Sequence, residues 1–182
     1  NGKFVGFGSG YDPVPEPEDD GEDVVAFANF MRATKAPSRG EITPDVLAGQ
    51  RVFDQAGCTV CHVAAIATAA PGTLVNGGVF PVPNALGYKI IRPYSDFLLH
   101  NIGTGDGIPV SPLAQHSTTT NQMRTAPLWG LRTRNRFMHD GLSFTKEDAI
   151  DRHGGQAAAV TWRYNELSAT EKAQLISFLD SL

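Results

Sequence analysis

Two cysteines and a histidine in the first half of the chain carry the most specific chemical signal in the sequence. Cys58, Cys61 and His62 follow the pattern C-x-x-C-H, which is the attachment signature of a c-type haem. Positions i, i+3 and i+4 of a helix share one face, so both sulfurs can reach the two vinyl groups at one edge of a porphyrin. The His62 ring can then bind the iron as the proximal ligand. We therefore predict one covalently bound haem c (heme c) at these three residues.

Other uses of a Cys-x-x-Cys pair fit the sequence less well. A structural zinc site needs four ligands, and the chain has no second C-x-x-C and no closely spaced pair of histidines. A thioredoxin-like redox pair requires a βαβ context, which the pattern of the sequence does not predict. No acidic loop resembles an EF-hand, so we expect no calcium and no metal other than the haem iron.

The second axial position of the iron determines what such a site can do. The candidates are the methionines and the remaining histidines: Met31, Met123, Met138, His100, His116, His139 and His153. His116 lies in a Ser/Thr-rich loop, where a solvated histidine is expected. His153 is better placed, because it closes a predicted helix and shares a face with the small side chain of Ala149. The helix dipole also favours a histidine at that position, so the spacing alone leaves the ligand open.

The elements that must position these residues are predicted mostly as helices. Thr43 and Pro44 form an N-cap and first-turn signal, and Ser168 with Glu171 forms a capping box. Hydrophobic spacing and these caps predict helices over residues 22–34, 44 to about 57, 95–101, 145–153 and 168 to the end of the chain. The last helix has an apolar stripe of Leu175, Ile176, Phe178, Leu179 and Leu182.

Between these helices we expect long ordered loops. Residues 68–86 and 103–122 are rich in loop-forming residues, and Asn76-Gly77 favours a short hairpin. Residues 1–21 combine glycines, prolines and acids without periodicity, which predicts an extended arm before a domain at 22–182. The sequence thus indicates a mainly α fold with long ordered loops.

Composition and charge exclude several classes of protein. Hydrophobic residues make up 41% of the 182 residues, enough for a core despite 19 glycines and 12 prolines. The net charge of −4 argues against nucleic acid as the main partner. The longest apolar run, as at residues 63–67, is far shorter than the roughly 20 residues of a membrane span, so no transmembrane segment is expected. The chain starts without an initiator Met or a signal peptide, which we interpret as a mature or truncated form.

Several ordered motifs resemble one family. R-T-A-P-L-W-G-L at 124–131, F-M-H-D-G at 137–141 and the segment 145–155 occur in that order, after R-P-Y-S-D at 92–96 and L-L-H at 98–100. Together they are similar to the C-terminal haem domain of the di-haem (thiol) oxidoreductases, which are related to bacterial di-haem cytochrome c peroxidases. The resemblance runs from about Asp23 to Leu182. It implies a cytochrome c-like haem domain, in which Gly49, Phe53 and Phe178 mark the close crossing of the first and last helices.

The resemblance also implies the identity of the second axial ligand. In the peroxidase branch, the residue 14 places after the histidine of H-D-G supplies that ligand, and counting from His139 reaches His153. Bis-His ligation by His62 and His153 is therefore implied, with low-spin iron.

Further haem contacts are expected from residues near these motifs. The resemblance implies that His139 hydrogen-bonds a propionate or a carbonyl near the haem. Haem propionates favour planar bidentate donors, for which the candidates are Arg124, Arg132, Arg134 and Arg136. The indole N–H of Trp129 could also donate to a propionate. A solvated surface position for each arginine, and a core position for Trp129, are the alternatives.

Two departures from the family pattern limit what can be transferred. The family carries a second C-x-x-C-H in an N-terminal half, which this chain lacks, so the chain is a fragment or a single-haem relative. Trp129 stands where the peroxidase branch has the arginine of T-P-x-L-R, so the contacts of that arginine are not carried over.

The expected function is single-electron transfer rather than enzymatic catalysis. Two imidazoles would fill both axial positions and leave none open for peroxide. The alternatives are the electron-feeding half of a di-haem peroxidase-like or thiol oxidoreductase enzyme, and a haem-anchored subunit of a larger complex docked through the arm. The expected partner is a redox protein or a second haem domain, and the expected location is the periplasm, because haem attachment in this family happens outside the cytoplasm.

Overall fold

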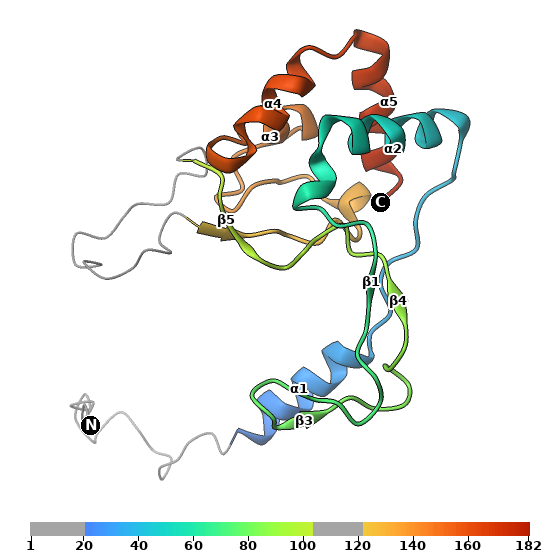
Figure 1. Cartoon of the computed structure of the whole chain (residues 1–182), viewed down its shortest axis with the longest axis vertical. Helices are drawn as coiled ribbons and strands as arrows, with labels where there is room; N and C mark the ends of the chain where they lie inside the picture. The colour runs from blue at the N-terminus through green and yellow to red at the C-terminus, as the bar shows by residue number, and fades with distance from the viewer. Residues whose placement is uncertain (1–20, 104–121) are drawn as a thin grey trace, which may run out of the picture. The chain divides into compact units, whose positions relative to one another are not determined.

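The computed structural model describes residues 21–103 and 122–182 of the chain (Figure 1). It divides into two compact units, with the boundary between Ala36 and Pro37. The predicted arm at 1–21 and the predicted loop at 103–122 lie almost entirely outside the described residues. No helix in the described part is both long enough and apolar enough to cross a lipid bilayer.

The first unit contains one described helix, α1 (Glu22–Ala33), where the periodicity predicts a helix over 22–34. Thr34 is its C-terminal cap. The large apolar side chains of α1 are all exposed, including those of Phe27 and Met31. The prediction of a helix is confirmed, and its apolar face is not buried by other described residues of the unit.

The second unit carries the other elements. Its helices are α2 (Pro44–Ala56), α3 (Lys146–Asp151), α4 (Ala158–Asn165) and α5 (Ala169–Asp180), with 3-10 turns η1 (Cys58–Val60), η2 (Leu131–Thr133) and η3 (Gly155–Ala157). Its strands are β1 (Ile66–Ala67), β2 (Leu74–Val75), β3 (Phe80–Pro81), β4 (Ile90–Ile91), β5 (Leu99–Asn101) and β6 (Gln122–Arg124). The strands pair antiparallel as three ribbons, β1 with β4, β2 with β3 and β5 with β6.

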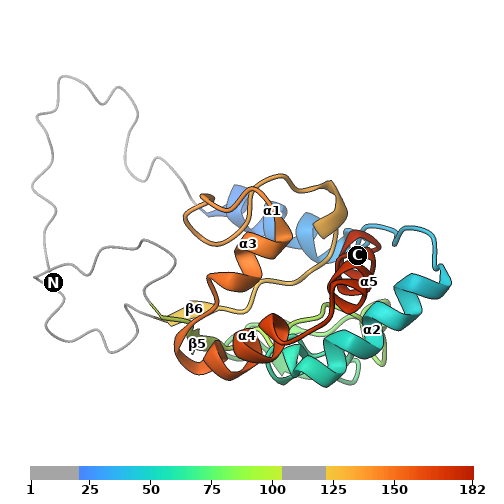
Figure 2. The same ribbon diagram turned by 90° about the horizontal axis from the view of Figure 1, so that it is seen from above.

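The core of the second unit forms where α2 and α5 lie side by side (Figure 2). Phe178 of α5 is fully buried, and its ring centroid lies 5.2 Å from that of Phe53 of α2. Gly49 allows this approach, because a Cβ atom built there would lie 1.8 Å from the carbonyl oxygen of Gln174. The expected close crossing of these helices at Gly49, Phe53 and Phe178 is confirmed.

The predicted caps explain where these helices begin. The Thr43 side chain accepts a hydrogen bond from the backbone N–H of Val46, and Pro44 occupies the first helical position of α2. Ser168 and Glu171 form a complete capping box before α5. The predicted hairpin at Asn76-Gly77 is also confirmed, since the ribbon of β2 and β3 encloses it.

The prediction of a helix over residues 95–101 is wrong. The Ser95 hydroxyl accepts from the Phe97 N–H, and the Asp96 carboxylate accepts from the Leu98 N–H, so local side-chain bonds replace the helical ones. Phe97 has a φ of 59°, in the left-handed region. Residues 99–101 then pair with β6 as strand β5.

The predicted helix over 145–153 is shorter than expected, and α4 was not predicted. Helix α3 starts at the Thr145 cap but ends at Asp151, two residues before His153. Helix α4 has no side-chain cap, and Val160 and Thr161 have lower intrinsic helix propensity than straight-chain residues. Its stability comes from tertiary contacts, since Tyr164 is buried in the core.

Candidate functional site

The C-x-x-C-H segment forms one tight turn at the C-terminal end of α2. Gly57 ends that helix with a φ of 92°, and η1 begins immediately after it. The backbone N–H of His62 donates to the carbonyl of Cys58 at 2.9 Å, so one helical turn closes over the motif. The segment is a short 3-10 turn, whereas the spacing argument assumed regular helix. It still brings the three predicted residues together.

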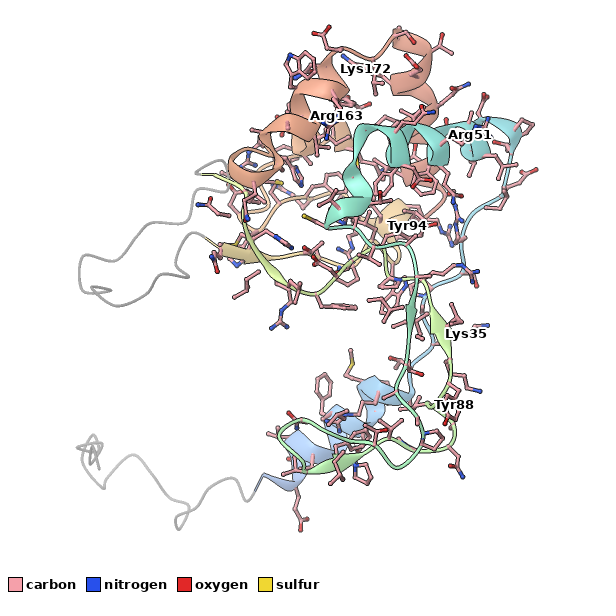
Figure 3. All side chains as sticks on the ribbon, in the orientation of Figure 1. Lys35, Arg51, Tyr88, Tyr94, Arg163 and Lys172 are labelled. Carbon is pink, nitrogen blue, oxygen red and sulfur yellow. The ribbon has the colours of Figure 1, made fainter. Side chains whose placement is uncertain are left out.

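The R-P-Y-S-D segment at residues 92–96 forms hydrogen bonds to this turn. The backbone N–H groups of Ser95 and Asp96 donate to the carbonyls of Val63 and Cys61, at 3.0 and 2.8 Å. Tyr94 supplies the carbonyl that fixes the His62 ring, 2.8 Å from its Nδ1 atom. Its own ring packs edge-on against Phe53 of α2 at 6.0 Å (Figure 3). The motif is therefore anchored by a segment more than thirty residues later in the chain.

The bond to Tyr94 defines which nitrogen of His62 is available to a metal. A carbonyl oxygen can only accept, so Nδ1 carries the proton and Nε2 keeps its lone pair. Metal-binding histidines are commonly fixed in this way by a carbonyl on the other ring nitrogen. Burial lowers the pKa of His62 to about 4. The ring is therefore neutral at pH 7, which is the state that coordinates a metal.

This pKa gives a testable pH dependence. Because the folded pKa lies below the unfolded value of 6.5, the His62 contribution is fully present above pH 6.5 and is lost as the pH falls toward 4. In the haem-free variant Cys58→Ala/Cys61→Ala we expect the free energy of unfolding to fall by up to about 3 kcal/mol over that interval. Urea unfolding at a series of pH values measures it. Adding His62→Gln should remove this part of the pH dependence, and an unchanged profile would contradict the assignment.

His153 is fixed in the same tautomer as His62. Its Nδ1 atom lies 2.6 Å from the carbonyl oxygen of Ala149, one helical turn earlier. The proton is again on Nδ1, and Nε2 keeps its lone pair. The pKa of His62 is lowered in part by the charge of His153, so the two rings are close enough to interact electrostatically. Both imidazoles thus have the proton on Nδ1 and the lone pair on Nε2.

His100 is the other histidine that interacts electrostatically with His62. Its Nε2 atom lies 2.7 Å from the Asp96 carboxylate, so this nitrogen is already hydrogen-bonded. Met123 lies opposite His100 in the ribbon of β5 and β6. The lone pair of His100 is therefore on Nδ1, whereas in His153, as in His62, it is on Nε2.

The two thiols do not behave as a reactive redox pair. Among the described residues they are not joined as a disulfide. Burial raises the pKa of Cys58 to about 11, and burial and Asp96 raise that of Cys61. Reactive cysteines in redox motifs have lowered pKa values instead. Asp96 and His100 come within 4.8 Å of the Cys61 sulfur, but these three groups fall short of the four ligands of a structural zinc site.

The other predicted haem contacts are less well placed. His139 and Arg124 are exposed. The indole N–H of Trp129 donates to the Arg92 carbonyl at 2.6 Å, so that bond is already made within the protein. Three of the predicted arginines donate to backbone carbonyls at 3.2 to 3.4 Å: Arg132 to Ser38, Arg134 to Trp129 and Arg136 to Gly141. Met31 lies in the first unit, and His116 lies outside the described residues.

Residues that sequence reasoning left without a role also reach the site. The Arg163 guanidinium on α4 donates to the Ala56 carbonyl at the end of α2, at 2.7 Å, and lowers the pKa of Cys58 (Figure 3). Asp96, which lies within 4.8 Å of the Cys61 sulfur and raises the pKa of that thiol, is another example. The aspartate stands in the quoted R-P-Y-S-D motif, whereas no local pattern distinguishes Arg152 or Arg163 from a surface arginine.

The surroundings of the site fit an apolar prosthetic group. Val60, inside the C-x-x-C-H motif, is 75% exposed, and Leu98 and Leu99 beside Asp96 are 61% and 46% exposed. Large apolar side chains gathered on the segments around a ligand site mark a surface that binds something apolar. The chain therefore offers two thiols, the Nε2 lone pairs of His62 and His153, and exposed apolar side chains, and these groups fit a covalently bound haem.

Comparisons with known proteins found similar solved structures and a protein family. No curated protein matches it. Two solved structures are similar: hydrazine synthase of Kuenenia stuttgartiensis, pressurized with xenon, at 21% identity and a TM-score of 0.46, covering 82% of this chain and 50% of that one; and a MauG-like protein associated with microbial copper homeostasis, at 22% and 0.46, covering 78% and 47%. The chain therefore spans about half the length of these proteins.

The match to a protein family is much more extensive. A family described as "Di-haem oxidoreductase, putative peroxidase" matches residues 2–182, almost the whole chain. This agrees with the resemblance of the motifs between residues 92 and 155. The chain belongs to the di-haem oxidoreductase family.

Proposed function

We propose that this chain is a c-type electron-transfer module of mainly α, cytochrome c-like fold that carries one haem. Cys58 and Cys61 bind it covalently, and His62 and His153 coordinate the iron. The observation that carries the proposal is that both imidazoles are in the same tautomer. Each donates its Nδ1 proton to a backbone carbonyl, of Tyr94 or Ala149, and keeps Nε2 for a metal.

The residues of the chain then have separate tasks. When bound, the haem supplies one-electron redox chemistry. His62 and His153 would be the two protein ligands of the iron, and together they would leave no open position for peroxide, oxygen or carbon monoxide. The Tyr94 and Ala149 carbonyls increase the basicity of the two rings, which lowers the reduction potential relative to a His/Met site. Electrons enter and leave without bond formation, and the expected partner is a redox protein or a second haem domain.

The visible absorption spectrum of the purified protein tests this proposal. We expect a low-spin haem spectrum in both oxidation states, and no change when carbon monoxide is added to the reduced protein. Denaturation and organic extraction should leave the haem on the chain, because it is attached through thioether bonds. A five-coordinate high-spin spectrum, or rapid binding of carbon monoxide, would overturn bis-His ligation.

The second candidate is the electron-feeding half of a di-haem peroxidase-like or thiol-oxidising enzyme. It is favoured by the family match over residues 2–182, together with a length about half that of the similar solved structures. In that case the reaction takes place in a partner domain, or at this haem after His153 dissociates. Peroxide turnover by the wild-type chain, which a bis-His carrier would not show, would support this candidate over the carrier.

Location and assembly follow from the same proposal. Haem attachment to a C-x-x-C-H motif in this family implies the periplasm, which fractionation of the native organism would test. A third role, as a haem-anchored subunit of a larger complex, depends on the predicted arm at residues 1–21. If the chain without that arm assembles unchanged, the third role is excluded.

A further inference from the structure

An ion pair joins the H-D-G turn to the end of α3. The Arg152 guanidinium binds both oxygens of the Asp140 carboxylate, and its Nη1 atom also donates to the Ser143 hydroxyl at 2.8 Å. Asp140 is fixed in turn, because its Oδ1 atom accepts the Leu142 N–H at 3.0 Å. Both charged side chains are mostly buried, with 21% and 13% of their surface exposed. Ser143 is fully buried.

This pair lies next to His153 in the chain. Arg152 is the residue before it and forms the C-terminal cap of α3. On the other side of His153, the Gly154 N–H donates to the Ile102 carbonyl at 2.8 Å, and the Thr161 hydroxyl donates to the carbonyl of His153 itself. The backbone that carries the imidazole is therefore held from both sides. On the N-terminal side the Arg152 and His153 N–H groups bond carbonyls within α3, and the bidentate pair links this end of α3 to the H-D-G turn.

We propose that the Asp140–Arg152 pair is a positioning device that keeps His153 on the iron and so keeps the sixth coordination position closed. The inference rests on the proposed bis-His function. Asp140 and Arg152 touch neither the ligand nitrogen nor the metal, and act through the backbone of residues 152 and 153. When the pair breaks, α3 loses its link to the H-D-G turn, and His153 leaves the iron more often.

The chemistry of the pair suits this task. A guanidinium and a carboxylate joined by two parallel bonds fix direction as well as distance, which a single bond does not. The turn that carries Asp140 is closed by backbone hydrogen bonds, from the Gly141 N–H to the Met138 carbonyl at 3.3 Å and from the Phe137 N–H to the Ser143 carbonyl at 2.9 Å. The position of His153 therefore depends on this hydrogen-bonded turn as well as on α3, a helix of six residues.

A second ion pair on the same helix provides the matched control. Lys146, at the start of α3, lies 2.6 Å from the Asp180 carboxylate at the end of α5. It links α3 to the core from the end opposite His153. Asp180→Asn should therefore remove an ion pair of the same helix, although one in which the aspartate is 55% exposed, while leaving the His153 backbone in place.

The experiment compares the haem-loaded wild type with Asp140→Asn, Arg152→Lys and Asp180→Asn. Electron paramagnetic resonance measures the high-spin fraction, and carbon monoxide binding to the reduced protein measures access to the sixth position. We expect Asp140→Asn and Arg152→Lys to increase both at least tenfold, and added imidazole to restore the low-spin spectrum. Asp180→Asn should match the wild type. Arg152→Lys retains the charge and serves as the decisive variant if Asp140→Asn does not fold.

The outcomes separate this inference from the function on which it rests. A low-spin wild type with unchanged Asp140→Asn and Arg152→Lys would overturn the positioning role alone. Equal effects in all three variants would also overturn it, because they would show a general loosening of α3. A wild type that already binds carbon monoxide would overturn the bis-His proposal, and the positioning role with it.

Discussion

Replacing His153 with alanine is expected to convert the iron from six-coordinate low-spin to five-coordinate high-spin almost completely. His153 presents Nε2 because its Nδ1 proton is held by the Ala149 carbonyl, and alanine removes that ligand without disturbing the bonds of its own backbone. The reduced variant should bind carbon monoxide stoichiometrically, where the wild type binds none. Absorption and electron paramagnetic resonance spectra of the two proteins measure the change.

His100→Ala is the matched control for that experiment. His100 also interacts electrostatically with His62, but its Nε2 atom is bonded to Asp96. We expect His100→Ala to remain low-spin, and exogenous imidazole to restore a low-spin spectrum in His153→Ala only. If His100→Ala becomes high-spin while His153→Ala does not, the sixth ligand is His100.

The part of the candidate site that can be predicted from the sequence is the part whose residues are neighbours in the chain. Cys58, Cys61 and His62 are neighbours in the chain, so spacing alone indicates what they bind. The acceptor that fixes His62 is a backbone carbonyl, at Tyr94, and a carbonyl has no side-chain signature in a sequence. Arg152 is similar, because its partner Asp140 lies 12 residues away across a turn and only the folded chain brings them together.

The fold, too, can be predicted from the sequence where local interactions determine an element, and not where distant ones do. Helices α2 and α5 were predicted because their caps, at Thr43 and Ser168, are side chains that bond backbone within three residues. Residues 95–101 were misassigned because Ser95 bonds the distant carbonyl of Thr125, and strand β5 needs β6 to form. Helix α4, with no cap, depends on contacts with α2 that periodicity does not encode.

The second large effect is expected from Gly49→Ala, at the crossing of α2 and α5. In an exposed helix this change is favourable by up to about 1 kcal/mol, because alanine is the better helix former. Here the added Cβ would lie 1.8 Å from the Gln174 carbonyl oxygen and 2.8 Å from the Cβ of Phe178. A backbone carbonyl cannot rotate away as a side chain does, so the two helices must separate and the packing of Phe53 on Phe178 must loosen.

We therefore expect Gly49→Ala to lower the free energy of unfolding by about 3 kcal/mol or more, the upper end for overpacked cores, and the melting temperature by roughly 10 °C. Because α2 ends at the C-x-x-C-H turn, the separation should also reduce the yield of haem-loaded protein. Arg51→Ala, an exposed position on the same helix (Figure 3), is the control and should change stability by less than about 0.5 kcal/mol. Thermal and urea unfolding of the haem-loaded proteins measure these changes in stability. A Gly49→Ala variant as stable as Arg51→Ala would mean that α2 and α5 do not cross at this glycine.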